Sequence, residues 1–112
     1  MENDESRDWY LAQSDANRQL FLTLVSYELT IHGRCFGVDL KGTAQVNALL
    51  GLNELQHQLS SHIFGIATQQ PRYPDDVFWN ILHEKAASYG ILAQFKHSIK
   101  YARQRTPPNK PN

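Results

Sequence analysis

The chain has 112 residues, of which 41% are hydrophobic and 20% are charged, with eleven basic residues against eleven acidic ones. This is the composition of a single globular domain spanning residues 1–112, and it excludes an intrinsically disordered chain. A net charge of zero provides no overall field that would attract nucleic acid. No apolar run approaches the length of a bilayer span and the acidic N-terminus is unlike a secretory signal, so we expect a cytoplasmic protein outside the membrane.

The first clear helix follows an acidic N-terminal segment, residues 1–13, whose conformation the sequence does not settle. It runs from a cap at Ser14 or Asp15 to about Arg34, because apolar residues recur along it at helical spacing. Serine and aspartate are good caps, since their oxygens accept the free N–H groups of a first turn. The glycine-containing residues 37–42 that follow predict a connecting loop.

A second helix is expected from Thr43 to about Ala67, where leucine and isoleucine recur every three or four residues without strand-like alternation. A third helical segment begins after the linker TQQPRYP, because proline and two aspartates suit the first turn of a helix. Gly90 predicts a break that would divide this segment into helices over about 75–88 and 91–104, although one continuous helix also fits the pattern. The proline-rich tail, residues 106–112, is predicted to be disordered.

The predicted architecture is therefore an all-α bundle of three long helices, or of four if the last segment breaks near Gly90. The sequence contains no Walker loop, no Gly-x-Ser-x-Gly and no His-Glu-x-x-His motif, so no catalytic activity is indicated. By elimination we expect a protein that acts by contact with other proteins, either as a homodimer or as a small adaptor.

A carboxylate and an imidazole one helical turn apart, Glu28 and His32, fall within the apolar face of the first helix. A buried carboxylate destabilises the fold unless it is paired, protonated or bound to a metal ion. The favoured interpretation is a hydrogen-bonded pair that fixes the packing of this helix. The alternative is a site for iron, manganese or zinc in the bundle core, completed by ligands from the other helices, namely His57, Glu54 and His83.

The third segment carries two apolar stripes, and a helix with two apolar faces needs two partners. One stripe is assigned to the core. The other is covered either by a helix of the same chain or by a second protein, and aromatic side chains are enriched at such interfaces. The predicted interface residues on this second stripe and its edge are Phe78, Trp79, Leu82, Ala86 and Tyr89.

Basic residues gather at the C-terminal end of the chain, where residues 94–112 contain no acid. Cations in the last turns of a helix complement its dipole, which is the simpler explanation. The alternative is a patch that binds a small anion or, less favoured, nucleic acid, and whose affinity would fall steeply with salt. The residues concerned are Lys96, Lys100, Arg103 and Arg105.

Overall fold

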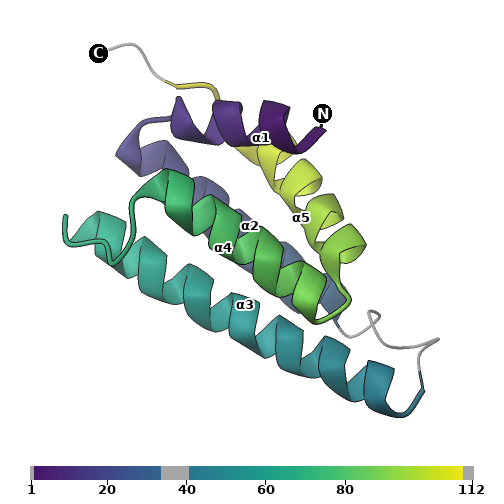
Figure 1. Ribbon diagram of the computed structural model, residues 1–112. Helices are drawn as coiled ribbons and strands as arrows, with labels where there is room; N and C mark the ends of the chain where they lie inside the picture. Colours follow the sequence, from purple (N-terminus) through teal and green to yellow (C-terminus); the bar gives the residue numbers. More distant parts are fainter. Residues whose placement is uncertain (1, 34–40, 110–112) are drawn as a thin grey trace.

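The computed structural model describes residues 2–33 and 41–109, which form five helices and no strand (Figure 1). The all-α prediction is confirmed, but the predicted number of three or four helices is wrong. The helices are α1 (Glu2–Leu11), α2 (Asp15–Gly33), α3 (Thr43–Ala67), α4 (Asp75–Ser88) and α5 (Leu92–Arg105). The predicted helix end at Arg34 and most of the predicted loop over 37–42 lie outside the described residues.

The additional helix is α1, which occupies most of the N-terminal segment. Its first two turns are polar, so the sequence shows no apolar periodicity there. Its C-terminal end is held by aromatic packing: the Trp9 and Phe21 rings meet edge to face at 5.0 Å, and Tyr10 stacks on Trp79 at 5.2 Å. Tertiary contacts of this kind stabilise a helix that its own sequence only weakly specifies.

The break between α4 and α5 lies at Gly90, as predicted. Gly90 has a φ of +75°, a left-handed conformation that glycine adopts without a steric penalty. The Ile91 N–H donates to the Ala86 carbonyl at 2.9 Å, and the Gly90 N–H donates to the Ala87 carbonyl at 3.1 Å. These two hydrogen bonds are the Schellman arrangement that ends a helix.

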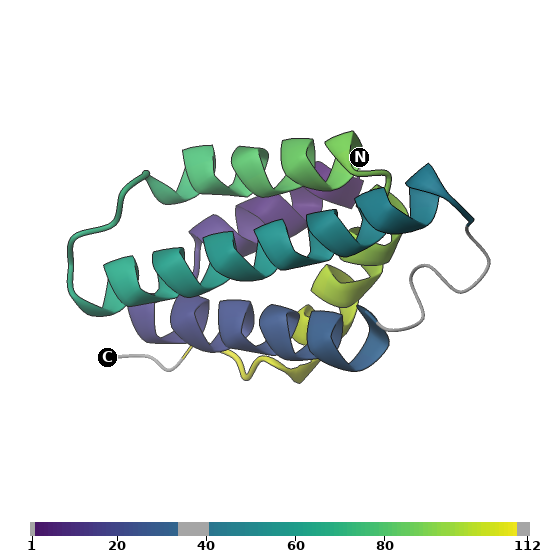
Figure 2. The ribbon, with the colours of Figure 1, turned by 90° about the horizontal axis from the view of Figure 1, so that it is seen from below.

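The helices α2 and α4 occupy the middle of the bundle, with α3 packed against both on one side and α5 against both on the other (Figures 1 and 2). The N-terminal helix α1 lies against α4. All five helices contribute fully buried side chains to one core, including Tyr10, Phe21, Leu29, Leu55, Leu59, Phe78, Leu82 and Phe95.

The residues predicted to form a partner interface are mostly part of this core. Phe78, Trp79, Leu82 and Ala86 are each 2% exposed or less, and Tyr89 is half-buried. The second apolar stripe of the third predicted segment is therefore covered by helices of the same chain. Phe78, Trp79, Leu82 and Ala86 cannot contact a second protein without opening the bundle, whereas Tyr89 stays partly accessible.

The described part of the predicted tail, residues 106–109, lies against the turn between α1 and α2. The Asn109 amide donates to the Ala12 carbonyl at 3.1 Å and accepts a hydrogen bond from the Ser14 N–H at 3.0 Å. Asn17 donates to the Pro107 carbonyl at 2.9 Å. Residues 110–112 lie outside the described residues.

Gly51 sets the distance between α3 and α4, because a Cβ atom at this position would lie 2.4 Å from Tyr89 Cβ. We therefore expect Gly51→Ala to destabilise the protein by about 1–3 kcal/mol, as overpacking of a core does, despite the higher helix propensity of alanine. Urea unfolding measures the difference, and Asn53→Ala on the exposed side of the same helix is the control. A Gly51→Ala protein as stable as the wild type would contradict the close approach.

Candidate functional site

Glu28 is satisfied by two side chains and does not need a metal ion. It is 1% exposed, its Oε2 lies 3.0 Å from His32 Nε2, and its Oε1 accepts a hydrogen bond from the Arg105 guanidinium of α5. An arginine and an imidazole compensate a buried carboxylate through charge-assisted hydrogen bonds. This geometry agrees with the interpretation of Glu28 and His32 as a hydrogen-bonded pair that fixes the packing of α2. Arg105 is an additional partner of Glu28 and joins α5 to α2.

The other predicted metal ligands do not approach this pair. Glu54 is 3.1 Å from Lys85 Nζ, His57 is exposed on α3, and His83 Nδ1 donates to the Trp79 carbonyl at 2.9 Å. Within residues 2–33 and 41–109, no group of three or more His, Cys, Asp or Glu side chains is arranged to hold a metal ion.

A polar cluster that the sequence analysis did not find is centred on Asp75, in the first turn of α4. Its Oδ1 accepts hydrogen bonds from the Tyr10 hydroxyl at 2.6 Å and from His62 Nε2 at 2.9 Å, while its Oδ2 lies 3.4 Å from Arg18 Nε. These four residues come from α1, α2, α3 and α4 and share no local motif. No spacing rule could have brought them together.

The electrostatics of this cluster favour an ionised Asp75. Burial alone would raise the pKa of the carboxyl, but the hydrogen bonds from His62 and Tyr10 and the charge of Arg18 outweigh it and hold the pKa below its ordinary value. Burial and the hydrogen bond to Asp75 raise the pKa of Tyr10, which therefore stays protonated. Tyr10 is fully buried and His62 is 4% exposed, while the Asp75 side chain is 25% exposed, so the cluster lies at the edge of the core and joins the four helices there.

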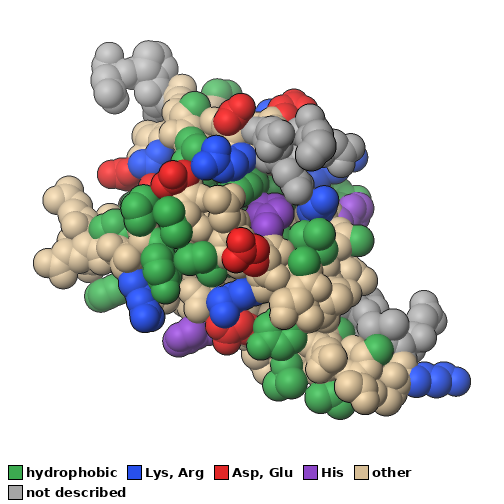
Figure 3. All heavy atoms as spheres, viewed as in Figure 1, with side chains coloured by type: hydrophobic (Ala, Val, Ile, Leu, Met, Phe, Trp, Pro, Cys, Tyr) green, Lys and Arg blue, Asp and Glu red, His purple; other side chains and the backbone are tan. Residues whose placement is uncertain are grey.

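Most of the exposed large apolar side chains lie on α2 and α3. Nine large hydrophobic side chains are exposed in the described residues, and seven of them belong to these two helices. The seven residues, which together define the α2–α3 face, are Leu20, Tyr27, Ile31, Val46, Leu49, Leu50 and Phe64. Several hydrophobic side chains are visible over the N-terminal half of α3 in Figure 3.

The α2–α3 face is also uncharged. Between Gln19 and Gly33 of α2, and along all of α3, the only Lys, Arg, Asp or Glu residues are Glu28 and Glu54. Glu28 is buried against α5, and Glu54 turns toward α4, where it meets Lys85. The charged side chains of the molecule are thus concentrated on the other helices.

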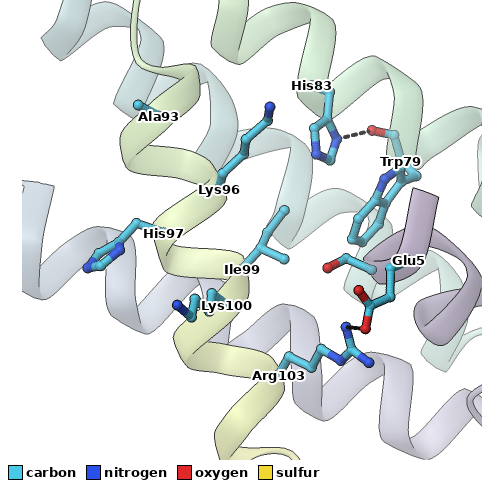
Figure 4. Close-up of a pocket in the computed structure, with 10 residues that line it drawn as sticks. Glu5, Trp79, His83, Ala93, Lys96, His97, Ile99, Lys100 and Arg103 are labelled. Atoms are coloured by element: carbon cyan, nitrogen blue, oxygen red, sulfur yellow. Dashed lines mark hydrogen bonds and ion pairs between the residues drawn. The ribbon is translucent and has the colours of Figure 1, made fainter. Parts of the chain in front are cut away.

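The predicted basic residues divide between two sides of α5. Lys96, Lys100 and Arg103 line a pocket of about 480 Å³ between α1, α4 and α5, whose walls are shown in Figure 4. Arg105 instead contacts Glu28. The helical spacing predicts this division. Arg105 follows Lys96 by nine residues, which at about 100° per residue places it on the opposite side of the helix.

Comparisons of the chain with protein-family models, with curated proteins and with solved structures find no match. None of the helices in the described ranges is long and apolar enough to cross a membrane. The surface chemistry of the bundle is therefore the basis for a functional proposal.

The low pKa of Asp75 predicts a pH-dependent stability. Because the folded-state pKa lies below the unfolded-state value of about 3.9, the ionised carboxylate stabilises the fold above that pH and loses its effect as the pH falls through the folded-state pKa. We expect Asp75→Asn to lower the free energy of unfolding by about 2 kcal/mol at neutral pH, as the loss of hydrogen bonds to a charged group does. It should also flatten the decline below about pH 4.

Asp76→Asn is the matched control, since Asp76 is exposed in the same helical turn and its nearest cation, Arg7, is 4.0 Å away. Urea unfolding of both variants between neutral and acid pH measures the effect. Equal losses in the two variants would mean that the charge near the start of α4, and not the cluster around Asp75, stabilises the fold.

Proposed function

We propose that the protein acts by binding another protein chain, and that the α2–α3 face pairs it with a second copy of itself. The observation that carries this proposal is the gathering of seven of nine exposed large apolar side chains on one uncharged surface. Exposed apolar patches on a protein surface often serve as interaction surfaces. The proposal keeps the predicted mode of action but replaces the predicted interface residues.

The absence of charge favours a second copy over an unlike partner. In a two-fold dimer the same patch occurs on both subunits, so a charged residue near the axis meets its own like charge. A patch without Lys, Arg, Asp or Glu avoids this repulsion, and the cores of protein interfaces are depleted in charge. A different protein could carry charges opposite to those of the patch, so binding to it would not require the patch to be uncharged.

The spacing along α2 also suits the packing of one helix on another. Leu20, Leu24, Tyr27 and Ile31 follow one another at intervals of four, three and four residues, the pattern of a helix–helix seam. Leu24 is half-buried and the other three are exposed, with Tyr27 at 57%. The seam therefore lacks a covering helix in the described part of the chain.

The size of the face is sufficient for a stable contact. The 19 residues of α2 span about 28 Å, and two helices side by side are about 20 Å wide. The outline of the face is thus roughly 600 Å², close to what one side of a standard interface buries.

The proposal predicts a dimer that a charge on the α2–α3 face dissociates. We expect the wild-type protein to have twice the mass of the chain in gel filtration with light scattering at about 10 μM, and the Tyr27→Arg/Leu50→Arg variant to be monomeric, because each interface residue of a hot spot contributes about 2 kcal/mol or more. Both side chains are about half exposed, so the substitutions leave the core intact.

Tyr101→Arg is the control, since Tyr101 is another exposed tyrosine but lies on α5. It should remain dimeric. Circular dichroism confirms that each variant is folded. A wild-type protein of monomer mass at about 100 μM would rule out self-association through this face at any affinity of that order.

A further inference from the structure

We propose that the pocket between α1, α4 and α5 binds a small organic anion, whose phosphate or carboxylate group is attracted by Lys96 and Arg103 and whose apolar body lies against the apolar part of the pocket lining. This inference rests on the pocket alone and is independent of the proposed dimer. The pocket has a volume of about 480 Å³, which is in the range of small-molecule sites.

The cations of the pocket come from one stripe of α5. Lys96, Lys100 and Arg103 are separated by four and three residues, so they lie on one face of the helix. In Figure 4, Lys96 and Arg103 flank Ile99 on the side of α5 that faces α4 and α1. Lys96 and Lys100 form no ion pair with any side chain of residues 5–33 and 41–109. Their positive charge is thus available to a ligand.

A carboxylate of the protein already occupies the position next to Arg103. Glu5 Oε1 lies 3.8 Å from Arg103 Nη1, and the Glu5 side chain is 74% exposed. An exposed ion pair of this length is weak, because water competes for both groups. Glu5 therefore marks where an anionic group is attracted and competes with a ligand for the same guanidinium.

The pocket also has an apolar part, formed by Trp79 of α4, which is 2% exposed, and Ile99 of α5, which is 5% exposed. His83 adds no charge: burial, together with the neighbouring Lys96, lowers the pKa of its imidazole although the hydrogen bond to the Trp79 carbonyl opposes this. Because His83 Nδ1 donates to that carbonyl, the neutral ring presents Nε2 as a hydrogen-bond acceptor.

The pocket differs from a surface that binds nucleic acid, because its cations lie on α5 and an aromatic side chain of α4 lies beside them. Such surfaces extend their basic residues along a groove and need many phosphate contacts. Here three cations line a single pocket, and Arg105 is paired with Glu28. One anionic group attached to a compact apolar body fits this arrangement.

Phenyl phosphate is a suitable probe, because it combines a ring with a phosphate group. Titration of the full chain, followed by the NMR signals of the Trp79 indole and the α5 amides, should give a Kd of about 1 mM, the affinity expected for a ligand of this size. Benzoate in place of phenyl phosphate distinguishes carboxylate from phosphate ligands. Phenol, which lacks the charge, and inorganic phosphate, which lacks the ring, should each bind at least about fivefold more weakly.

Two substitutions should change the affinity in opposite directions. Lys96→Met should weaken the binding of phenyl phosphate about fivefold, because it removes a cation and retains the length of the side chain. Glu5→Gln should strengthen it about twofold, because it removes the competing carboxylate. A merely structural role of Lys96 would not produce a gain on substitution of Glu5.

Lys41→Met, on an exposed lysine before α3, is the control and should leave the affinity unchanged. The Tyr27→Arg/Leu50→Arg variant should also bind as the wild type does, because its substitutions are remote from the pocket. The proposal is overturned if neither phenyl phosphate nor benzoate binds, or if their affinity is the same in the wild type, Lys96→Met and Glu5→Gln.

Discussion

The carboxylate of Asp75 is the contact on which the arrangement of the helices depends. It accepts hydrogen bonds from α1 and α3 and lies next to an arginine of α2, while its own position in the first turn of α4 places it near the positive end of that helix. Burying a charge is favourable only when partners replace its hydration. Tyr10 and His62 supply those hydrogen bonds, so the cluster fixes α1 across α4. Since α1 forms one wall of the pocket, Asp75 indirectly sets the pocket's shape.

A second buried carboxylate, Glu28, does the same for the other end of the chain by receiving Arg105 from α5. The two clusters use charged groups inside the bundle, and the remaining charged residues lie mainly on α1, α4 and α5. This distribution leaves residues 19–33 of α2 and all of α3 with many exposed apolar side chains and, apart from Glu54, which pairs with Lys85, with no exposed Lys, Arg, Asp or Glu. The two proposed sites therefore have contrasting chemistry: a neutral face suited to another copy of the chain, and a basic pocket suited to an anion.

Local features of the sequence were sufficient to predict α2, α3 and the break at Gly90, because caps, apolar spacing and a left-handed glycine act within a few residues. They were insufficient for α1, whose packing depends on Phe21 and Trp79, far away in the chain. The same limit applies to the sites. The stripe of Lys96, Lys100 and Arg103 follows from helical spacing, whereas the residues around Asp75 are brought together only by the tertiary fold.

The uneven charge of the chain explains why the pocket is basic although the net charge is zero. The sequence places an excess of acids in its first 19 residues and of bases in its last 19. Folding brings these segments together, since Glu5 of α1 lies 3.8 Å from Arg103 of α5. Among the side chains of residues 5–33 and 41–109, no carboxylate pairs with Lys96 or Lys100, which lie farther from the C-terminal end of α5. A local positive charge beside an apolar wall is the result, and it requires no basic composition of the protein as a whole.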